Sequence, residues 1–235
     1  LVPFANYVNA GPYAADVTNT PATKPSGELL ITCVTERTGT FAGTDVAPGS
    51  SAWIGSTRNY SMTGECKRSG SSTPLPAVMP LTDDKQSLLT TIESFTPAGS
   101  TAGHLGTAWA WYAISPQWNS VWSLSTPIAG NNDIGTMKVA VLMTDGEYNT
   151  QYSTPDSKTQ ALALCNGMKA AGITVYTVGF GLGTSNAADI AAMDTLAKCA
   201  SGKDFFFTAY DGEALRQVFT FIGGKVNAIN AVLTD

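Results

Sequence analysis

The chain has 235 residues, 43% of them hydrophobic and only 13% charged, and 18 acidic against 13 basic side chains give a net charge of −5. This length and apolar content suffice for the core of one elaborated α/β domain. The acidic balance argues against nucleic acid and anionic membrane surfaces as partners, because no basic stripe is available to neutralise phosphates. No apolar run approaches the ~20 residues that a membrane-spanning helix needs.

The first half of the chain is predicted to be irregular. Residues 1–4 have the pattern of a strand end, and residues 29–34 predict a strand. Much of residues 10–80 is rich in Gly, Ser, Thr and Pro, which is typical of long surface excursions. We therefore expect a single domain over residues 1–235 that contains an insertion-rich region at 10–80.

Two helices are predicted next, joined by a small-residue loop. Thr82-Asp83-Asp84 has the pattern of a helix start, and residues 103–114 form a second apolar helix that ends at Ser115-Pro116. The loop between the two reads Thr-Pro-Ala-Gly-Ser-Thr-Ala-Gly over residues 96–103. Asp83, Asp84 and Glu93 have calcium-ligand chemistry, but a helix cap and a solvated face explain them more simply.

The most informative stretch is a buried strand that stops at an acidic residue. Residues 139–143 are continuously apolar, which is typical of a parallel strand covered on both faces, and Thr144-Asp145-Gly146 follows at once. Ligands of open α/β sheets bind outside the carboxyl ends of the strands. Asp145 is therefore a candidate for polar chemistry, although capping of the turn or of the next helix explains it as well.

The second half alternates between strands and helices. After the strand at 139–143 we expect a helix over residues 157–172, a strand over 173–180, a helix over 187–200, a short strand over 204–208 and a last helix capped by Asp211. Such alternation implies right-handed crossovers. The predicted fold class is therefore α/β, with a mostly parallel sheet and helices on both of its faces.

Four cysteines bear on the cellular compartment. None of them has the C-x-x-C spacing of a zinc or redox site, so two disulfides are the simplest interpretation, with four reduced buried thiols as the alternative. Of the three possible connectivities we predict Cys33–Cys66 and Cys165–Cys199. The second bridge would join consecutive helices on one face of the sheet, and each would stabilise the fold by roughly 3 to 4 kcal/mol.

The small-residue loop and the strand stop resemble two motifs of the von Willebrand factor type A domain. Thr101 and Asp145 match the loop threonine and the later aspartate of that family's metal-ion-dependent adhesion site. The resemblance implies a hard divalent cation, Mg²⁺ or Ca²⁺, held by oxygen ligands at the carboxyl edge of the sheet. Glu147 is a possible further ligand, for which turn chemistry is an equal explanation.

A narrower resemblance extends over nearly the whole chain. The sequence is similar to TadG-like proteins of the tight-adherence (Flp) pilus system in its segments 1–9, 33–37, 80–85, 109–116, 142–149, 175–180 and 199–201. This resemblance implies a bacterial envelope protein, periplasmic or at the cell surface. It further implies a non-enzymatic adhesion or assembly module whose partners are proteins or pilus components.

The chain departs from the family at one motif. The Asp-x-Ser-x-Ser strand and the helix after it should precede Leu1, but the chain starts without them, and without an initiator methionine, so we expect a fragment or a processed product. Without that strand the cation would lose most of its ligands, and an inert site is the alternative. The resemblance places the strand between residues 1–4 and 139–143. An upstream segment or a strand donated by a neighbouring subunit would fill the gap.

Other functions have weaker support. His104 could form a triad with Ser100 or Ser115 and Asp145, but there is no Gly-x-Ser-x-Gly turn, and a histidine packed at a helix start is the simpler reading. A metal-dependent hydrolase would need a base and a nucleophile near Asp145. A structural subunit of a surface filament, with an inert site, is the remaining alternative.

Tryptophans are a last source of candidate contacts. Trp109 and Trp111 have helical spacing and are expected in the core. Trp118 and Trp122 fall in a loop region and are candidates for an exposed contact with a partner.

Overall fold

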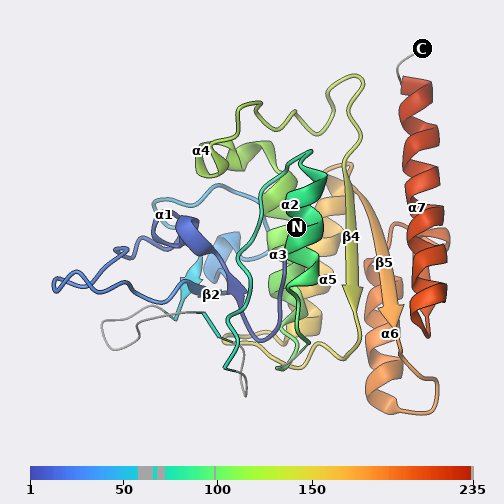
Figure 1. The fold of residues 1–235 in the computed structure, drawn as a ribbon, viewed down its shortest axis with the longest axis horizontal. Coiled ribbons are helices and arrows are strands. Elements are labelled where there is room, and N and C mark those ends of the chain that lie inside the picture. Colours follow the sequence, from blue (N-terminus) through green and yellow to red (C-terminus); the bar gives the residue numbers. More distant parts are fainter. Residues whose placement is uncertain (58–65, 68–71, 98, 234–235) are drawn as a thin grey trace.

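The computed structural model describes residues 1–57, 66–67, 72–97 and 99–233. The C-terminal part of the chain is built on a parallel sheet of three strands, β4 (Val139–Thr144), β5 (Thr174–Phe180) and β6 (Phe206–Ala209), in the order β4-β5-β6 (Figure 1). Val139 pairs with Thr174, and Thr177 pairs with Phe206. The predicted parallel α/β fold is confirmed. β6 begins two residues later than expected because a 3-10 turn, Lys203–Phe205, precedes it.

Helices cover both faces of this sheet. α5 (Ser157–Ala170), α6 (Ala187–Cys199) and α7 (Gly212–Leu233) alternate with the strands, as the sequence predicted. Leu164 and Met168 of α5 pack with Val175 on one face, and α6 lies on that face too, where its Leu196 carbonyl accepts a hydrogen bond from Thr177. On the opposite face, the side chain of Ile222 on α7 packs against the alternate β5 residues. In Figure 1, α7 runs along the flank beyond β5.

The first half forms a second, antiparallel sheet. Its strands are β1 (Val8–Asn9), β2 (Cys33–Thr35) and β3 (Gly55–Ser56), in the order β1-β2-β3, and α1 (Ala14–Thr18) lies beside them. Val34 pairs with both Val8 and Ser56. The strand predicted at 29–34 is therefore shorter and begins at Cys33.

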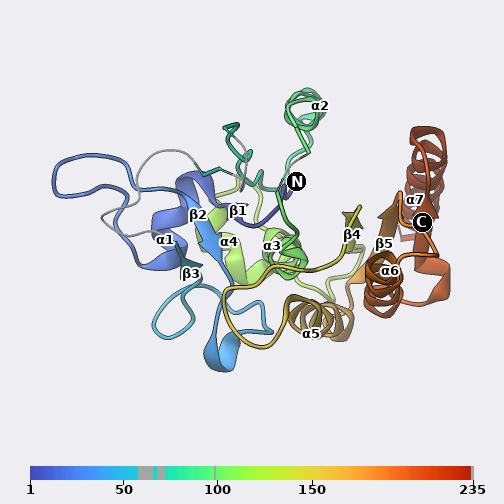
Figure 2. The same ribbon diagram turned by 90° about the horizontal axis from the view of Figure 1, so that it is seen from below.

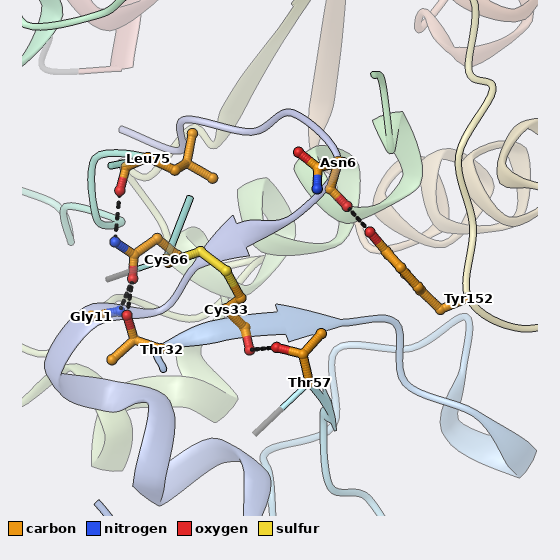
Figure 3. Close-up of a disulfide and its surroundings, with 9 residues drawn as sticks. Asn6, Gly11, Thr32, Cys33, Thr57, Cys66, Leu75 and Tyr152 are labelled. Carbon is orange, nitrogen blue, oxygen red and sulfur yellow. Dashed lines mark hydrogen bonds between the residues drawn. A yellow bond between two sulfur atoms is a disulfide. The ribbon is translucent and has the colours of Figure 1, made fainter. Parts of the chain in front are cut away.

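Both predicted disulfides are present. Cys33 bonds to Cys66, with 5.0 Å between the Cα atoms, and Cys165 bonds to Cys199, with 5.2 Å. Figure 3 shows the first bridge, where the hydroxyl of Thr57 donates to the Cys33 carbonyl oxygen at 3.2 Å. The second bridge joins α5 to α6, as expected for consecutive helices on one face of a sheet.

The two helices between the sheets differ in their surroundings. α2 (Lys85–Glu93) is capped by Asp84, whose carboxylate accepts the Ser87 N–H at 3.1 Å, and none of its residues is buried. In Figure 2 it stands clear of the rest of the domain. α3 (Gly103–Ile114), in contrast, is almost fully buried and packs against α5 and β4. α3 is therefore the helix that connects the two sheets.

The expectation that β4 is covered on both faces was wrong. Ala140 and Leu142 are buried, but the alternate residues Val141 and Met143 are 37% and 42% exposed. Within the described residues, β4 pairs only with β5. Phe4 forms only an isolated bridge, with Val8, so the strand expected to end near residue 4 is not formed. Residues 1–4 do not pair with β4, and the sequence analysis expected a further strand between these two segments. One edge and one face of β4 are thus uncovered.

The expectation of an exposed contact at Trp118 and Trp122 was also wrong. Their exposed fractions are 0% and 3%. A 3-10 turn, Pro116–Trp118, and the short helix α4 (Asn119–Trp122) fold both rings back onto α3. Both rings meet Trp109 edge to face, and Trp118 also stacks on Tyr112. The Trp118 indole N–H donates to the Asp45 carbonyl oxygen at 2.9 Å and that of Trp122 to the Tyr112 carbonyl oxygen at 2.8 Å. Their polar atoms are satisfied internally, which allows burial.

Across the part of the chain that the structure describes, no helix has the length and apolarity needed to cross a membrane.

Candidate functional site

The chain turns sharply where β4 ends. The Thr144 hydroxyl accepts the Gly146 N–H at 3.2 Å, and the turn leaves the side chains of Asp145 and Glu147 exposed. Tyr148 then points inward, and burial raises the pKa of its phenol to about 12. A Cβ atom on Gly103, the first residue of α3, would collide with the Tyr148 ring. Glycine at this position lets the loop pack directly on the start of α3.

The predicted threonine lies beside this turn. The Thr101 N–H donates to the Asn149 side-chain oxygen at 3.0 Å, and the Thr101 carbonyl oxygen accepts the N–H groups of Asn149 and Thr150 at 3.0 and 3.2 Å. A Cβ atom placed on Gly146 would lie 3.6 Å from the Thr101 hydroxyl oxygen. The structure thus brings the loop of Thr101 against the loop of Asp145 at the carboxyl end of the sheet. That Thr101 and Asp145 share one cation stays a prediction.

The oxygen chemistry at this edge suits a hard cation, but the ligand set is small. Thr101, Asp145 and Glu147 offer a hydroxyl and two carboxylates, whereas Mg²⁺ and Ca²⁺ take about six to eight oxygen ligands. Among the described residues, no group of three or more His, Cys, Asp or Glu side chains is arranged to hold a metal ion. Water or another segment would have to complete the coordination.

His104 lies in the core, as the simpler interpretation predicted. It is 1% exposed, and its Nδ1 atom lies 2.7 Å from the hydroxyl of Ser157, while its Nε2 atom lies 3.4 Å from the Glu36 carboxylate. Ser115 instead donates to the carboxylate of Asp45 at 2.5 Å. The structure therefore does not form a triad of Ser115, His104 and Asp145.

Glu36 is the residue that sequence analysis missed. It is 6% exposed, and one of its oxygens accepts the N–H groups of Tyr152, at 2.6 Å, and Ser153. Burial by itself would raise the pKa of this carboxyl, but the neighbouring His104 ring and the backbone N–H groups that it accepts outweigh burial and lower the pKa to about 2. The available signal was a Glu-Arg pair directly after an apolar strand, where charges are otherwise sparse.

Arg37 closes the buried polar region. Its guanidinium lies 5.3 Å from the centre of the Tyr112 ring and 5.9 Å from that of Trp118, and burial lowers its pKa. Between Glu36, Arg37 and His104 lies a cavity of about 10 Å³. This volume holds about one water molecule and no organic substrate.

Together these features define a class of protein: an α/β domain with a parallel sheet, helices on both faces, and two hydrogen-bonded polar loops at the carboxyl edge. The family model of the von Willebrand factor type A domain matches residues 71–221, more than half of the sequence, and the chain belongs to that family.

Comparison with solved structures found chains of low sequence identity. Two structures of proximal thread matrix protein 1 from the mussel byssus, the second with a zinc-occupied MIDAS motif, are 16% and 19% identical, with TM-scores of 0.37 and 0.40 over 66% and 61% of this chain. The pilus adhesin SpaC from Lactobacillus rhamnosus GG is 12% identical, with a TM-score of 0.44 over 63% of this chain. The matches cover 31%, 31% and 21% of those chains. No curated protein matches this sequence.

Proposed function

We propose that this chain is a non-enzymatic adhesion or assembly module of a bacterial envelope pilus system of the tight-adherence type, acting at the periplasm or cell surface. Domains of this family mediate protein interactions and are typically non-enzymatic. The two disulfides fit an oxidising compartment outside the cytoplasm. The assignment to the pilus system rests on the TadG-like sequence segments.

A divalent cation at Thr101 and Asp145 is the proposed means of binding. The observation that carries this proposal is the hydrogen-bonded contact between Thr101 and Asn149, which places the two loops side by side at the carboxyl edge of the sheet. Glu147 is a further candidate ligand. A bound Mg²⁺ or Ca²⁺ would supply an open coordination position for an acidic side chain of the partner.

The module also takes up one more strand at the uncovered edge of β4. The exposed faces of Val141 and Met143 support this proposal, because edge strands with free N–H and C=O groups and apolar side chains readily pair with another segment. The proposed source is the upstream part of the same gene product, and a strand donated by a neighbouring subunit is the alternative. The proposed unit is a single type A domain over residues 1–235, with an insertion-rich region at 10–80.

A structural subunit with an inert site is the second candidate function. It is favoured by the small ligand set, because the described residues include no group of three potential metal ligands. A metal-dependent hydrolase has less support, since the buried His104 and Glu36 face a cavity that admits about one water molecule.

Calorimetric titration with Mg²⁺ and Ca²⁺ tests the cation, on this chain and on a chain extended upstream by its natural sequence. We expect the extended chain to bind, and Asp145→Asn to weaken binding at least tenfold, whereas Asp204→Asn, remote in sequence, should bind like the wild type. Binding of envelope proteins that persists unchanged in EDTA would contradict the cation-dependent module and favour the inert structural subunit. Turnover in an esterase or phosphatase screen would favour the hydrolase.

A further inference from the structure

Three buried polar side chains meet behind the two loops of the candidate site. Glu36 follows β2, His104 lies in the first turn of α3, and Ser157 is the first residue of α5, and all three are shielded from solvent. Burying a carboxylate is costly unless it is paired and hydrogen-bonded. Apolar packing therefore does not explain why the Glu36–His104–Ser157 cluster is buried.

The cluster forms one continuous line of contacts. Ser157 contacts His104 Nδ1 at 2.7 Å, and His104 Nε2 lies 3.4 Å from one oxygen of Glu36. The other oxygen of Glu36 accepts the backbone N–H groups of Tyr152 and Ser153. The line thus starts on α5, crosses the beginning of α3 and ends on the backbone of the segment that leaves the Asp145 turn.

These contacts involve residues next to both loops of the candidate site. His104 follows Thr101 by three residues, and Tyr152 follows Asn149, the partner of Thr101, by three residues. The Tyr152 hydroxyl also donates to the Asn6 carbonyl oxygen at 2.6 Å (Figure 3). The Tyr152 ring stacks on Tyr7, with 5.0 Å between ring centres. The segment after Asp145 is therefore held at its backbone by Glu36 and at its side chain by the N-terminal segment.

Hydrogen bonds fix the position of a backbone segment more precisely than apolar contacts do. Apolar burial is non-directional and would leave the 152–153 backbone free to shift along the surface of α3. A carboxylate that accepts two backbone N–H groups fixes both the distance and the orientation of that backbone. Cation sites require this precision, because ligand atoms must lie within about half an ångström of the productive geometry.

We propose that Glu36, supported by His104 and Ser157, is a positioning residue that holds the Thr101 loop and the Asp145–Ser153 segment in register for cation binding. The proposal rests on the proposed function for its purpose. The contacts that carry it are independent of any cation.

Amide hydrogen exchange, followed by NMR in the full chain, tests the proposal. In Glu36→Gln, whose amide nitrogen replaces one acceptor oxygen, we expect the Asn149, Tyr152 and Ser153 amides to exchange at least tenfold faster, with β5 amides unchanged. The matched control is Asp45→Asn, a second buried carboxylate in the same region, which bonds to Ser115 and Gln117 and to neither loop. It should leave the loop amides at wild-type rates. Ser157→Ala gives the same readout, with a smaller expected increase, if Glu36→Gln fails to fold.

Two outcomes would overturn the proposal. In the first, the loop amides keep their wild-type exchange rates in Glu36→Gln and in Ser157→Ala. In the second, the β5 amides of these variants accelerate as much as their loop amides, which indicates general destabilisation. Calorimetry with Mg²⁺ on the same proteins separates this proposal from the proposed function. If the wild type binds, Glu36→Gln should raise Kd at least tenfold and Asp45→Asn should not. If neither this chain nor the chain extended upstream binds, the cation function fails, and the loop exchange rates alone decide the positioning role.

Discussion

At the scale of single residues, the charge of Glu36 is coupled to the stability of the fold. Its folded-state pKa of about 2 lies below the ordinary 4.5, so the charged form is favoured by folding. This contribution to stability is fully present above pH ~4.5 and is lost as the pH falls towards 2.

We therefore predict that Glu36→Gln removes part of the acid sensitivity of the fold. The wild type should lose about 1 to 3 kcal/mol of unfolding free energy through this group between pH 4.5 and 2, measured by urea denaturation. In Glu36→Gln the slope over that range should be shallower. Glu93→Gln, on the exposed α2, is the control and should follow the wild type. Equal slopes in all three proteins would contradict the pKa assigned to Glu36.

Gly103 provides a steric test of the loop contact. Gly103→Ala should destabilise the protein by about 1 to 3 kcal/mol, because the new methyl group meets the Tyr148 ring. Gly223→Ala is the matched control within α7, where a Cβ meets no atom within 4 Å. It should stabilise the helix by about 0.5 to 1 kcal/mol. Thermal denaturation of both variants checks the opposite signs, and equal shifts would argue against the contact.

At the scale of elements, β4 has two unequal faces. Leu142 packs into the core while Val141 lies on the uncovered face. Sequence analysis identified the strand and its end correctly but assumed cover on both faces. A run of apolar residues reports what a strand would bury and does not report whether a covering element is present.

We predict that neighbouring substitutions in β4 have unequal effects on the free energy of unfolding. Leu142→Ala should lower the unfolding free energy by about 2 to 5 kcal/mol, since it opens a cavity. Val141→Thr should change it by less than about 0.5 kcal/mol. Chemical denaturation measures both. A large loss in Val141→Thr would show that something in the folded chain covers this face.

At the scale of the whole molecule, the two disulfides brace different halves. Cys33–Cys66 links β2 of the antiparallel sheet to residue 66 in the insertion-rich region, and Cys165–Cys199 links α5 to α6. Each closes a loop of about 33 residues, and the chain-entropy model then gives about 3 to 4 kcal/mol for each bridge.

Removing the bridges one at a time should separate their effects. We predict that the double variant Cys165→Ala with Cys199→Ala loses about 3 to 4 kcal/mol of unfolding free energy in urea. The double variant at Cys33 and Cys66 should instead raise amide exchange mainly in β1 and β2. Insensitivity of the wild type's unfolding midpoint to a reductant would count against both.

The order of strands and helices, the α/β class, the disulfide pairs and the approach of the Thr101 and Asp145 loops could all be predicted from the sequence. The strand and helix order and the fold class follow from local periodicity and turn residues, and the disulfide pairs from the cysteine count and the expected order of helices on one face. The approach of the two loops was implied by the resemblance to the type A domain, together with the rule that ligands bind at the carboxyl ends of parallel strands. The tertiary structure alone decided the burial of Trp118 and Trp122, the open face of β4, and the meeting of Glu36, His104 and Ser157. The Glu36–His104 and His104–Ser157 contacts join residues 68 and 53 positions apart, and the Trp118–Asp45 hydrogen bond joins residues 73 apart, separations at which one sequence carries no periodic signal.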